Sequence, residues 1–158
     1  MTARHGSYAK LIGGGVLAVA LIVLLVILIA GRGGSQPTPA PSVAQSLNTE
    51  AELENLFQTH ASGVQIAGHG VVTHLLSDDN EGDRHQRFIL ELSSGQTLLI
   101  AHNIDIAPRL DGLAVGDQVA FFGEYDYNDQ GGTIHWTHHD PQGTHVAGWL
   151  DWDGRRYS

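Results

Sequence analysis

Hydrophobic and polar positions divide this chain of 158 residues into one wholly apolar segment and a longer region of mixed pattern. Residues 11–30, from Leu11 to Ala30, read LIGGGVLAVALIVLLVILIA and contain no charged side chain. A helix rises about 1.5 Å per residue, so this length matches the roughly 30 Å hydrocarbon core of a bilayer. The pattern therefore predicts a transmembrane helix.

A cleavable signal peptide is the alternative for this segment, because Arg4 and Lys10 precede it. The segment is longer than the usual signal core of about 7 to 15 residues, and Leu28 stands where a cleavage site requires a small residue. We therefore expect an uncleaved signal anchor. Since only Arg32 lies just after the helix, the positive-inside rule predicts that residues 1–10 are cytoplasmic and that the rest of the chain is exported.

The sequence after the predicted anchor is first that of a tether and then that of a folded domain. Residues 31–48 are rich in Gly, Pro and Ser and contain few apolar side chains, which is typical of a linker. Residues 49–158 form the predicted domain. It opens at Thr49 with TEAE, a capping-box pattern, and continues with apolar residues at helical spacing, which predicts a short amphipathic helix.

Beyond this helix the pattern becomes that of β-strands. Five runs with strand-like patterns are bounded by turn residues, at 64–76, 84–92, 96–102, 118–125 and 133–137. Gly68 and Gly70 in the first run predict a bend or a bulge. The pattern predicts a mainly β fold, a small five-stranded OB-like barrel preceded by a short helix, in addition to the transmembrane helix. An open β-sandwich or another partly closed roll is consistent with the same runs.

The predicted domain is strongly acidic. All 17 acidic residues of the chain lie at or beyond Glu50, where the only Lys or Arg side chains are five arginines, so the formal charge of this region is −12. Such a charge repels polyanions and disfavours direct nucleic-acid binding without divalent cations. The chain has no cysteine, so any metal site must use nitrogen and oxygen donors.

Nine of the ten histidines lie in the same domain. Two of them are at the ends of predicted strands, where the sites of small barrels usually open, and four follow or end the last strand. Imidazole is a common ligand of Zn²⁺, Cu²⁺ and Ni²⁺, and of Mn²⁺ or Fe²⁺ when oxygen ligands are added. The candidate metal ligands are His85, His102, His135, His138, His139 and His145. Alternatively, these histidines hydrogen-bond carbonyls and carboxylates and pin a long carboxyl-terminal loop.

Four further residues are candidates for binding a small ligand: Arg87, Asn103, Asp105 and Arg109. A guanidinium can hold a phosphate or a carboxylate through two hydrogen bonds, and the two polar residues follow a candidate metal ligand at a strand end. The alternative for the arginines is an internal salt bridge, for example from Arg109 to Asp111.

Three strings in the domain are long and distinctive: HQRFIL from His85, AHNIDIAPR from Ala101, and HWTHHDP from His135. In this order they resemble a family of small exported bacterial proteins that is classified as a domain of unknown function. The resemblance covers residues 64–157. It implies a location in the bacterial envelope and implies no activity.

The anchor, the tether and the histidines together lead to three hypotheses. The first is a binding module, held in the bacterial inner (cytoplasmic) membrane with its domain in the periplasm or outside the cell, that binds a transition metal or a small ligand through histidines. The second is an envelope assembly protein that contacts another envelope protein, with structural histidines. The third is a metal-dependent hydrolase of phosphodiester-type bonds. In all three, the lipid bilayer is a partner through the amino-terminal helix.

Overall fold

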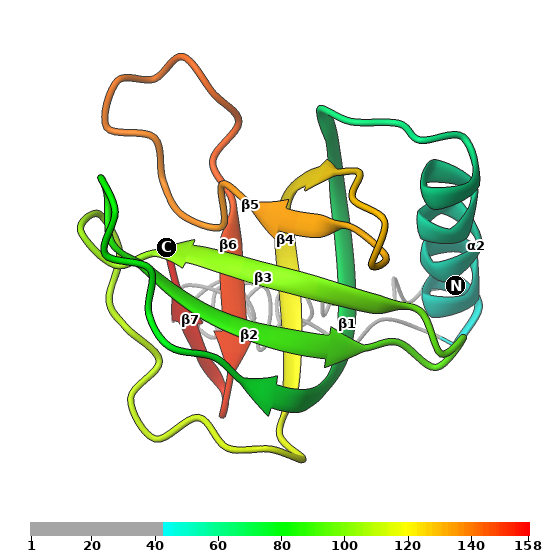
Figure 1. Cartoon of the computed structure of the whole chain (residues 1–158), viewed down its shortest axis with the longest axis horizontal. Coiled ribbons are helices and arrows are strands. Elements are labelled where there is room, and N and C mark those ends of the chain that lie inside the picture. Colours follow the sequence, from blue (N-terminus) through cyan, green and yellow to red (C-terminus); the bar gives the residue numbers. More distant parts are fainter. Residues whose placement is uncertain (1–42) are drawn as a thin grey trace, which may run out of the picture. The chain divides into compact units, whose positions relative to one another are not determined.

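The computed structural model of the chain describes residues 43–158, with side chains from residue 49 onward (Figure 1). The predicted transmembrane helix, residues 11–30, and most of the predicted linker lie outside these residues. Within residues 43–158, no helix combines the length and the apolar character that a bilayer crossing requires.

Helix α2 (Val43–Gln58) precedes the strands. It begins within the predicted linker, before Thr49, so the predicted capping box lies inside the helix and does not start it. The buried carboxylate of Glu50 accepts hydrogen bonds from the backbone N–H of Ser93 (3.2 Å) and from its hydroxyl (2.7 Å). Because Ser93 lies in the turn between the second and third strands, these bonds fix the helix to the barrel.

Five strands close into a barrel: β1 (Val64–Leu75), β2 (His85–Glu91), β3 (Thr97–Asn103), β4 (Gln118–Asp126) and β5 (Thr133–His135). Hydrogen bonding follows the order β1-β2-β3-β5-β4, and β4 pairs back with β1. The strands β3 and β5 are parallel, whereas the other neighbouring pairs are antiparallel. The prediction of a mainly β, five-stranded barrel with a short helix before it is confirmed.

Two short strands that the sequence pattern does not predict extend the sheet. Strand β6 (Trp149–Trp152) pairs with β4, and β7 (Arg155–Tyr157) pairs with β6. The prediction of five strands is therefore incomplete, because strands of four and three residues are too short to show an alternating pattern. The sequence signal for this hairpin is the dipeptide Asp153-Gly154, which forms the turn between β6 and β7. Its φ angles of 49° and 70° are typical of a tight hairpin.

Large apolar side chains fill the interior of the barrel, including those of Phe88, Ile100, Phe121 and Tyr125. A Cβ placed on Gly68 would lie 2.5 Å from the ring of Phe121, so glycine makes room for this ring. The register irregularity of β1 lies between Val72 and His74, so of the two predicted alternatives a bulge at Gly68 or Gly70 is wrong, and a bend there stays a prediction. Since residues alternate across a strand, every second residue of β4 faces outward.

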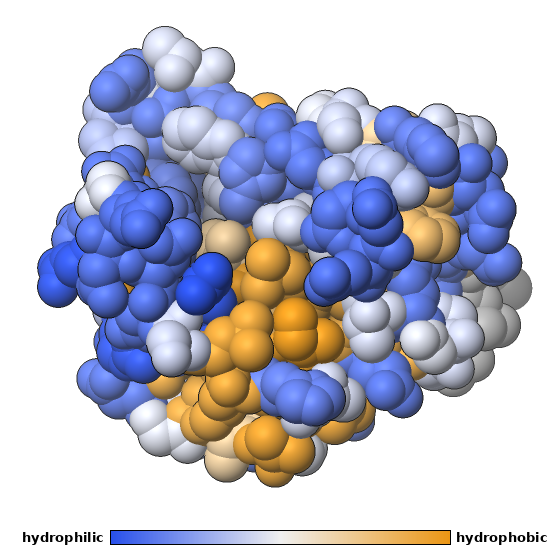
Figure 2. Space-filling model, in the orientation of Figure 1, coloured by the Kyte–Doolittle hydropathy of each residue, from blue (hydrophilic) through white to orange (hydrophobic). Residues whose placement is uncertain are grey.

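The outer surface is apolar in one area of the face shown in Figure 2. Apolar side chains gather over the middle and lower part of this view, where β2 is in front, and hydrophilic side chains surround them. Val71, Leu75 and Leu76 near the end of β1 are among the exposed large hydrophobic residues. The loop after β5, which carries several candidate ligands, rises from the upper left of the same view and is mostly hydrophilic.

Candidate metal centre

Two acidic residues and a histidine lie side by side on the outer face of the barrel. Alternation along β4 places Glu124 and Asp126 on the same face. The antiparallel register then pairs Glu124 with His135 of β5 on one side and with Gln65 of β1 on the other. Side chains that are paired in this way on one face lie about 5 Å apart at Cβ.

The three potential ligand groups converge closely. His135 Nε2 lies 2.9 Å from Asp126 Oδ2 and 3.5 Å from Glu124 Oε1. One donor atom from each of the three residues falls within 4.8 Å of the other two. A cluster of one imidazole nitrogen and two carboxylate oxygens is a donor set that a divalent transition-metal ion accepts.

The protein holds one oxygen of each carboxylate and leaves the other facing His135. The Gly63 N–H donates to Asp126 Oδ1 at 3.0 Å. His145 Nε2 lies 2.8 Å from Glu124 Oε2. Asp126 Oδ2 and Glu124 Oε1 are therefore oriented toward the same point, as the ligands of one ion would be.

His145 supports Glu124 from the loop after β5. Its Nδ1 lies 2.9 Å from the carbonyl of Val146, and its ring stacks on Trp136 with centroids 4.1 Å apart and an interplanar angle of 8°. Burial alone would lower the pKa of His145, but the hydrogen bonds to Glu124 and to the Val146 carbonyl outweigh it and raise the pKa. With an acceptor at each nitrogen, this ring is suited to donate to Glu124 rather than to bind a metal itself.

Asp140 organises the loop that carries His145. Its carboxylate accepts hydrogen bonds from the backbone N–H groups of Gln142 (2.8 Å), Thr144 (2.5 Å) and His145 (2.7 Å). These bonds, that of Gln142 first, hold the pKa of Asp140 at about 2. Asp140 is therefore bound by its own loop and positions His145.

Two partly buried side chains at this cluster have buried polar atoms that form no hydrogen bond. Within residues 49–158, both side-chain amide atoms of Gln65 have no hydrogen-bond partner, and His135 Nε2 lies 2.9 Å from Asp126 Oδ2 without hydrogen-bond geometry. Leaving such a group unpaired costs about 1 to 3 kcal/mol, so native structures usually supply a water, an ion or a ligand. Since Gln65 and His135 flank Glu124 on its two sides, the unpaired atoms point to an ion or a ligand at this cluster.

Not all predicted metal ligands reach the cluster. His102 points into the barrel interior, where Nδ1 lies 2.8 Å from Thr137 Oγ1 and Nε2 lies 3.1 Å from the Pro108 carbonyl. Burial lowers its pKa to about 4. Both ring nitrogens are engaged, which fits the structural alternative for this histidine. His139 is exposed, while His85 and His138 line a separate pocket that His135 also borders.

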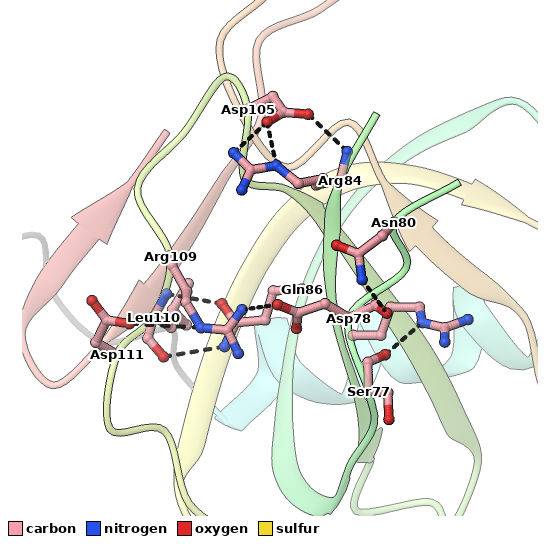
Figure 3. Close-up of polar contacts among 10 residues, drawn as sticks. Ser77, Asp78, Asn80, Arg84, Gln86, Asp105, Arg109, Leu110 and Asp111 are labelled. Atoms are coloured by element: carbon pink, nitrogen blue, oxygen red, sulfur yellow. Dashed lines mark hydrogen bonds and ion pairs between the residues drawn. The ribbon is translucent and has the colours of Figure 1, made fainter. Parts of the chain in front are cut away.

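The four residues predicted to bind a small ligand make internal contacts, and Figure 3 shows those of Asp105 and Arg109. Arg109 pairs with Asp78 and lies 3.6 Å from Asp111, and Arg84 binds Asp105 through Nε at 2.7 Å. Arg87 donates to the Ser77 carbonyl at 3.1 Å, and Asn103 Oδ1 accepts from the Asp105 N–H at 2.9 Å. For the arginines, these contacts match the alternative of internal pairing.

Glu124 and Asp126 are candidate ligands that the sequence pattern does not reveal. The predicted strand 118–125 ends before Asp126. The sequence pattern therefore does not place Glu124 and Asp126 on one strand. The available signal is two carboxylates spaced by two positions on a strand, since such residues share a face. No sequence signal places His135 beside them, because that contact comes from strand pairing.

A closed five-stranded barrel with a carboxylate and histidine cluster on its outer surface is the class of protein that these observations define. The model of a family described as a protein of unknown function (DUF3465) matches residues 40–158, and the chain belongs to this family. A comparison with curated proteins finds no match. The predicted membership in a family of unknown function is confirmed, while the bacterial origin stays a prediction.

Proposed function

We propose that this protein is a membrane-anchored, extracytoplasmic binding module that holds a divalent transition-metal ion through Glu124, Asp126 and His135. The observation that carries the proposal is the convergence of one donor atom from each residue within 4.8 Å. Each carboxylate has one oxygen held by the protein and one oxygen directed to the cluster. The site is thus largely formed before an ion binds.

The donor set favours Zn²⁺ among the candidate ions. Zn²⁺ binds histidine nitrogen and carboxylate oxygen, whereas Cu²⁺ and Ni²⁺ are better served by several imidazoles, and Mn²⁺ tolerates the same mixed set. Two carboxylates offset the charge of a divalent ion, and the formal charge of −12 beyond residue 49 raises the local concentration of cations. Metal-binding carboxylates are usually hydrogen-bonded by groups behind them, as Glu124 is by His145.

The fold supports a binding role through rigidity. The order β1-β2-β3-β5-β4 with a parallel β3–β5 pair supports the assignment of an OB-like barrel. Two ligands lie on β4 and the third at the end of β5, and paired strands hold ligands more precisely than a free loop does. The anchor and the exported orientation rest on the apolar run 11–30 and the charges that flank it.

Metal titration of the full chain in detergent tests the proposal. We expect one Zn²⁺ per chain by calorimetry and equilibrium dialysis, with Mn²⁺, Ni²⁺ and Cu²⁺ measured in parallel. Zn²⁺ binding should be weakened more than about 10-fold by each of the substitutions Glu124→Gln, Asp126→Asn and His135→Gln. Loss of a residue that only supports a ligand already weakens metal binding about 10-fold, and loss of a ligand itself should do more. His139→Gln, an exposed histidine near the cluster in sequence, is the matched control. Absence of Zn²⁺ binding, or equal affinity in all variants, would refute the proposal.

Protease protection tests the predicted location. The full chain is produced in a bacterium with a tag at each end, and protease is added to spheroplasts. We expect loss of the carboxyl-terminal tag and protection of the amino-terminal tag. Without protease, the whole chain should stay in the membrane after alkaline extraction. Protection of both tags in intact spheroplasts, or release of the whole chain from the membrane, would contradict the anchor.

A further inference from the structure

A pocket of about 300 Å³ lies beside the candidate metal centre and is formed by three segments that are distant in sequence. His85 contributes from the start of β2, Asn103 from the end of β3, and Trp136, His138 and Gln142 from the loop after β5. Each of the strings that begin at His85, Ala101 and His135 supplies lining residues. The strings that carry the family resemblance therefore meet at this pocket.

Two histidines that line the pocket each have one ring nitrogen without a hydrogen-bond partner among the described residues. His85 Nδ1 lies 2.8 Å from the Asp83 carbonyl, and His138 Nδ1 lies 2.7 Å from the His139 carbonyl. A carbonyl can only accept, so each neutral ring carries its hydrogen on Nδ1 and a lone pair on Nε2. No residue in the described part of the chain bonds either Nε2. Burial lowers the pKa of His138, which keeps this ring neutral and its Nε2 an acceptor.

The charge of the lining excludes anions. No lysine or arginine lines the pocket, whereas Asp83 and Asp140 do. The Asp140 carboxylate is already bound by the N–H groups of its own loop, so Asp83 is the carboxylate left to meet a ligand. The pocket therefore suits a ligand without negative charge that donates hydrogen bonds.

The size and the apolar walls of the pocket favour an organic ligand over a bare metal ion. A volume of about 300 Å³ is at the lower end of the range of about 300 to 1,000 Å³ that is usual for small-molecule sites. Ile106, Trp136 and Pro141 supply apolar wall, and the Trp136 ring is fixed by stacking on His145 and by a tilted contact with His138. Trp136 adopts φ 51°, a region that bulky residues rarely occupy and that is common at functional sites.

We propose that this pocket binds an uncharged polyhydroxyl ligand of the monosaccharide type. Hydroxyl groups donate to the Nε2 atoms of His85 and His138 and to Asp83, and the amide nitrogen of Asn103 donates to a ligand oxygen. The apolar face of a sugar ring packs on Ile106 and Trp136. His135, a ligand of the proposed metal ion, also borders the pocket. None of the groups that hydrogen-bond the sugar is a ligand of that ion, so sugar binding does not require the metal.

Saturation-transfer NMR on the full chain tests the proposal, in a detergent without a sugar headgroup and with EDTA present. The probes are glucose, N-acetylglucosamine, glucosamine and glucuronate, which share a ring and differ in charge. We expect saturable binding of the two neutral sugars with a Kd of about 1 mM, and weaker binding of glucuronate. Loss of one neutral hydrogen bond in His85→Ala should weaken binding about five-fold. His74→Ala, an exposed histidine of β1, should leave it unchanged.

A second variant covers the case in which changes to the histidines disturb the fold. Gln142 is exposed at the pocket, and its backbone N–H rather than its side chain bonds Asp140, so Gln142→Trp should fill the pocket and abolish binding without loosening the loop. The proposal is overturned by no saturation up to about 50 mM neutral sugar, far above a millimolar Kd. It is equally overturned by tighter binding of glucuronate, by unchanged binding in both His85→Ala and Gln142→Trp, or by loss of binding with EDTA.

Discussion

Glu124 of β4 and His145 of the loop after β5 are separated by 21 residues in sequence, yet Glu124 Oε2 and His145 Nε2 lie 2.8 Å apart. This bond fixes one carboxylate oxygen and turns the other toward His135. The loop after β5 thereby orients a strand residue to which it is not otherwise connected. It links the loop, the acidic pair and the proposed metal ion in one arrangement.

Removal of His145 should weaken metal binding without abolishing it. In His145→Ala, Glu124 keeps its charge but loses the partner that orients it, so we expect Zn²⁺ affinity to fall about 10- to 100-fold. The fall should be smaller than that caused by His135→Gln. Competition with a chromophoric chelator measures both variants. If His145→Ala binds Zn²⁺ with the affinity of the wild-type protein, the hydrogen bond from His145 does not position Glu124.

Replacement of Gln65 by glutamate should strengthen Zn²⁺ binding. Gln65 is paired with Glu124 across β1 and β4, and its buried amide has no partner in the described residues. A third carboxylate there offers another oxygen ligand, but without metal it adds repulsion among like charges. We expect Gln65→Glu to lower the Tm in EDTA and to show a larger Tm increase with Zn²⁺ than the unchanged protein.

Gln118→Glu is the control for this variant, because Gln118 is exposed on the same strand as Glu124 but distant from the cluster. Gln65→Leu removes the polar amide and should lower the response of the Tm to Zn²⁺. If Gln65→Glu and Gln118→Glu respond alike to the metal, Gln65 does not face the ion.

Acid should destabilise the domain through His102. Burial lowers the pKa of this ring from 6.5 to about 4, so between these pH values the unfolded chain binds a proton that the folded chain does not. The neutral His102 ring therefore contributes about 3 kcal/mol to the free energy of unfolding above pH 6.5. This contribution is lost as the pH falls to 4. Urea unfolding at pH 7 and at pH 4.5 measures the difference for the unchanged protein and for His102→Gln. The variant should lose less stability on acidification, and an equal loss would contradict this role.

Gly68→Ala should destabilise the barrel, because the added Cβ would lie 2.5 Å from the Phe121 ring. Overpacking of this kind costs about 1 to 3 kcal/mol. Thermal unfolding measures the change. In the double variant, Phe121→Leu replaces the ring by a smaller side chain and should recover part of the stability lost in Gly68→Ala. Strict additivity of the two changes would argue against a clash.

The difference between prediction and structure follows from the range of the interactions involved. Alternation of apolar and polar residues is local, and it locates β1 to β5 within a few residues. The hairpin of β6 and β7 is missed because each strand is short and, unlike the equally short β5, neither lies in a longer strand-like run between turn residues. The helix begins at Val43 in a segment whose composition resembles a tether, since contacts with the barrel contribute to helix stability.

The histidines illustrate the same limit. Their number identifies the carboxyl-terminal region as a candidate site, but the sequence treats His102 and His135 alike. In the fold, His102 faces the apolar interior with both nitrogens engaged, whereas His135 meets two carboxylates on the outer face. Which side of the barrel a residue faces decides between these roles.

The sequence by itself determined the apolar run of residues 11–30, the acidic and cysteine-free composition, and the five strands, because each depends on composition or on neighbours along the chain. Only the tertiary structure decided that Glu124, Asp126 and His135 meet and that His85 and His138 line a different pocket. The physical reason is that strand register and closure of the barrel set these distances. Both arise from packing across the whole fold, which no local pattern records.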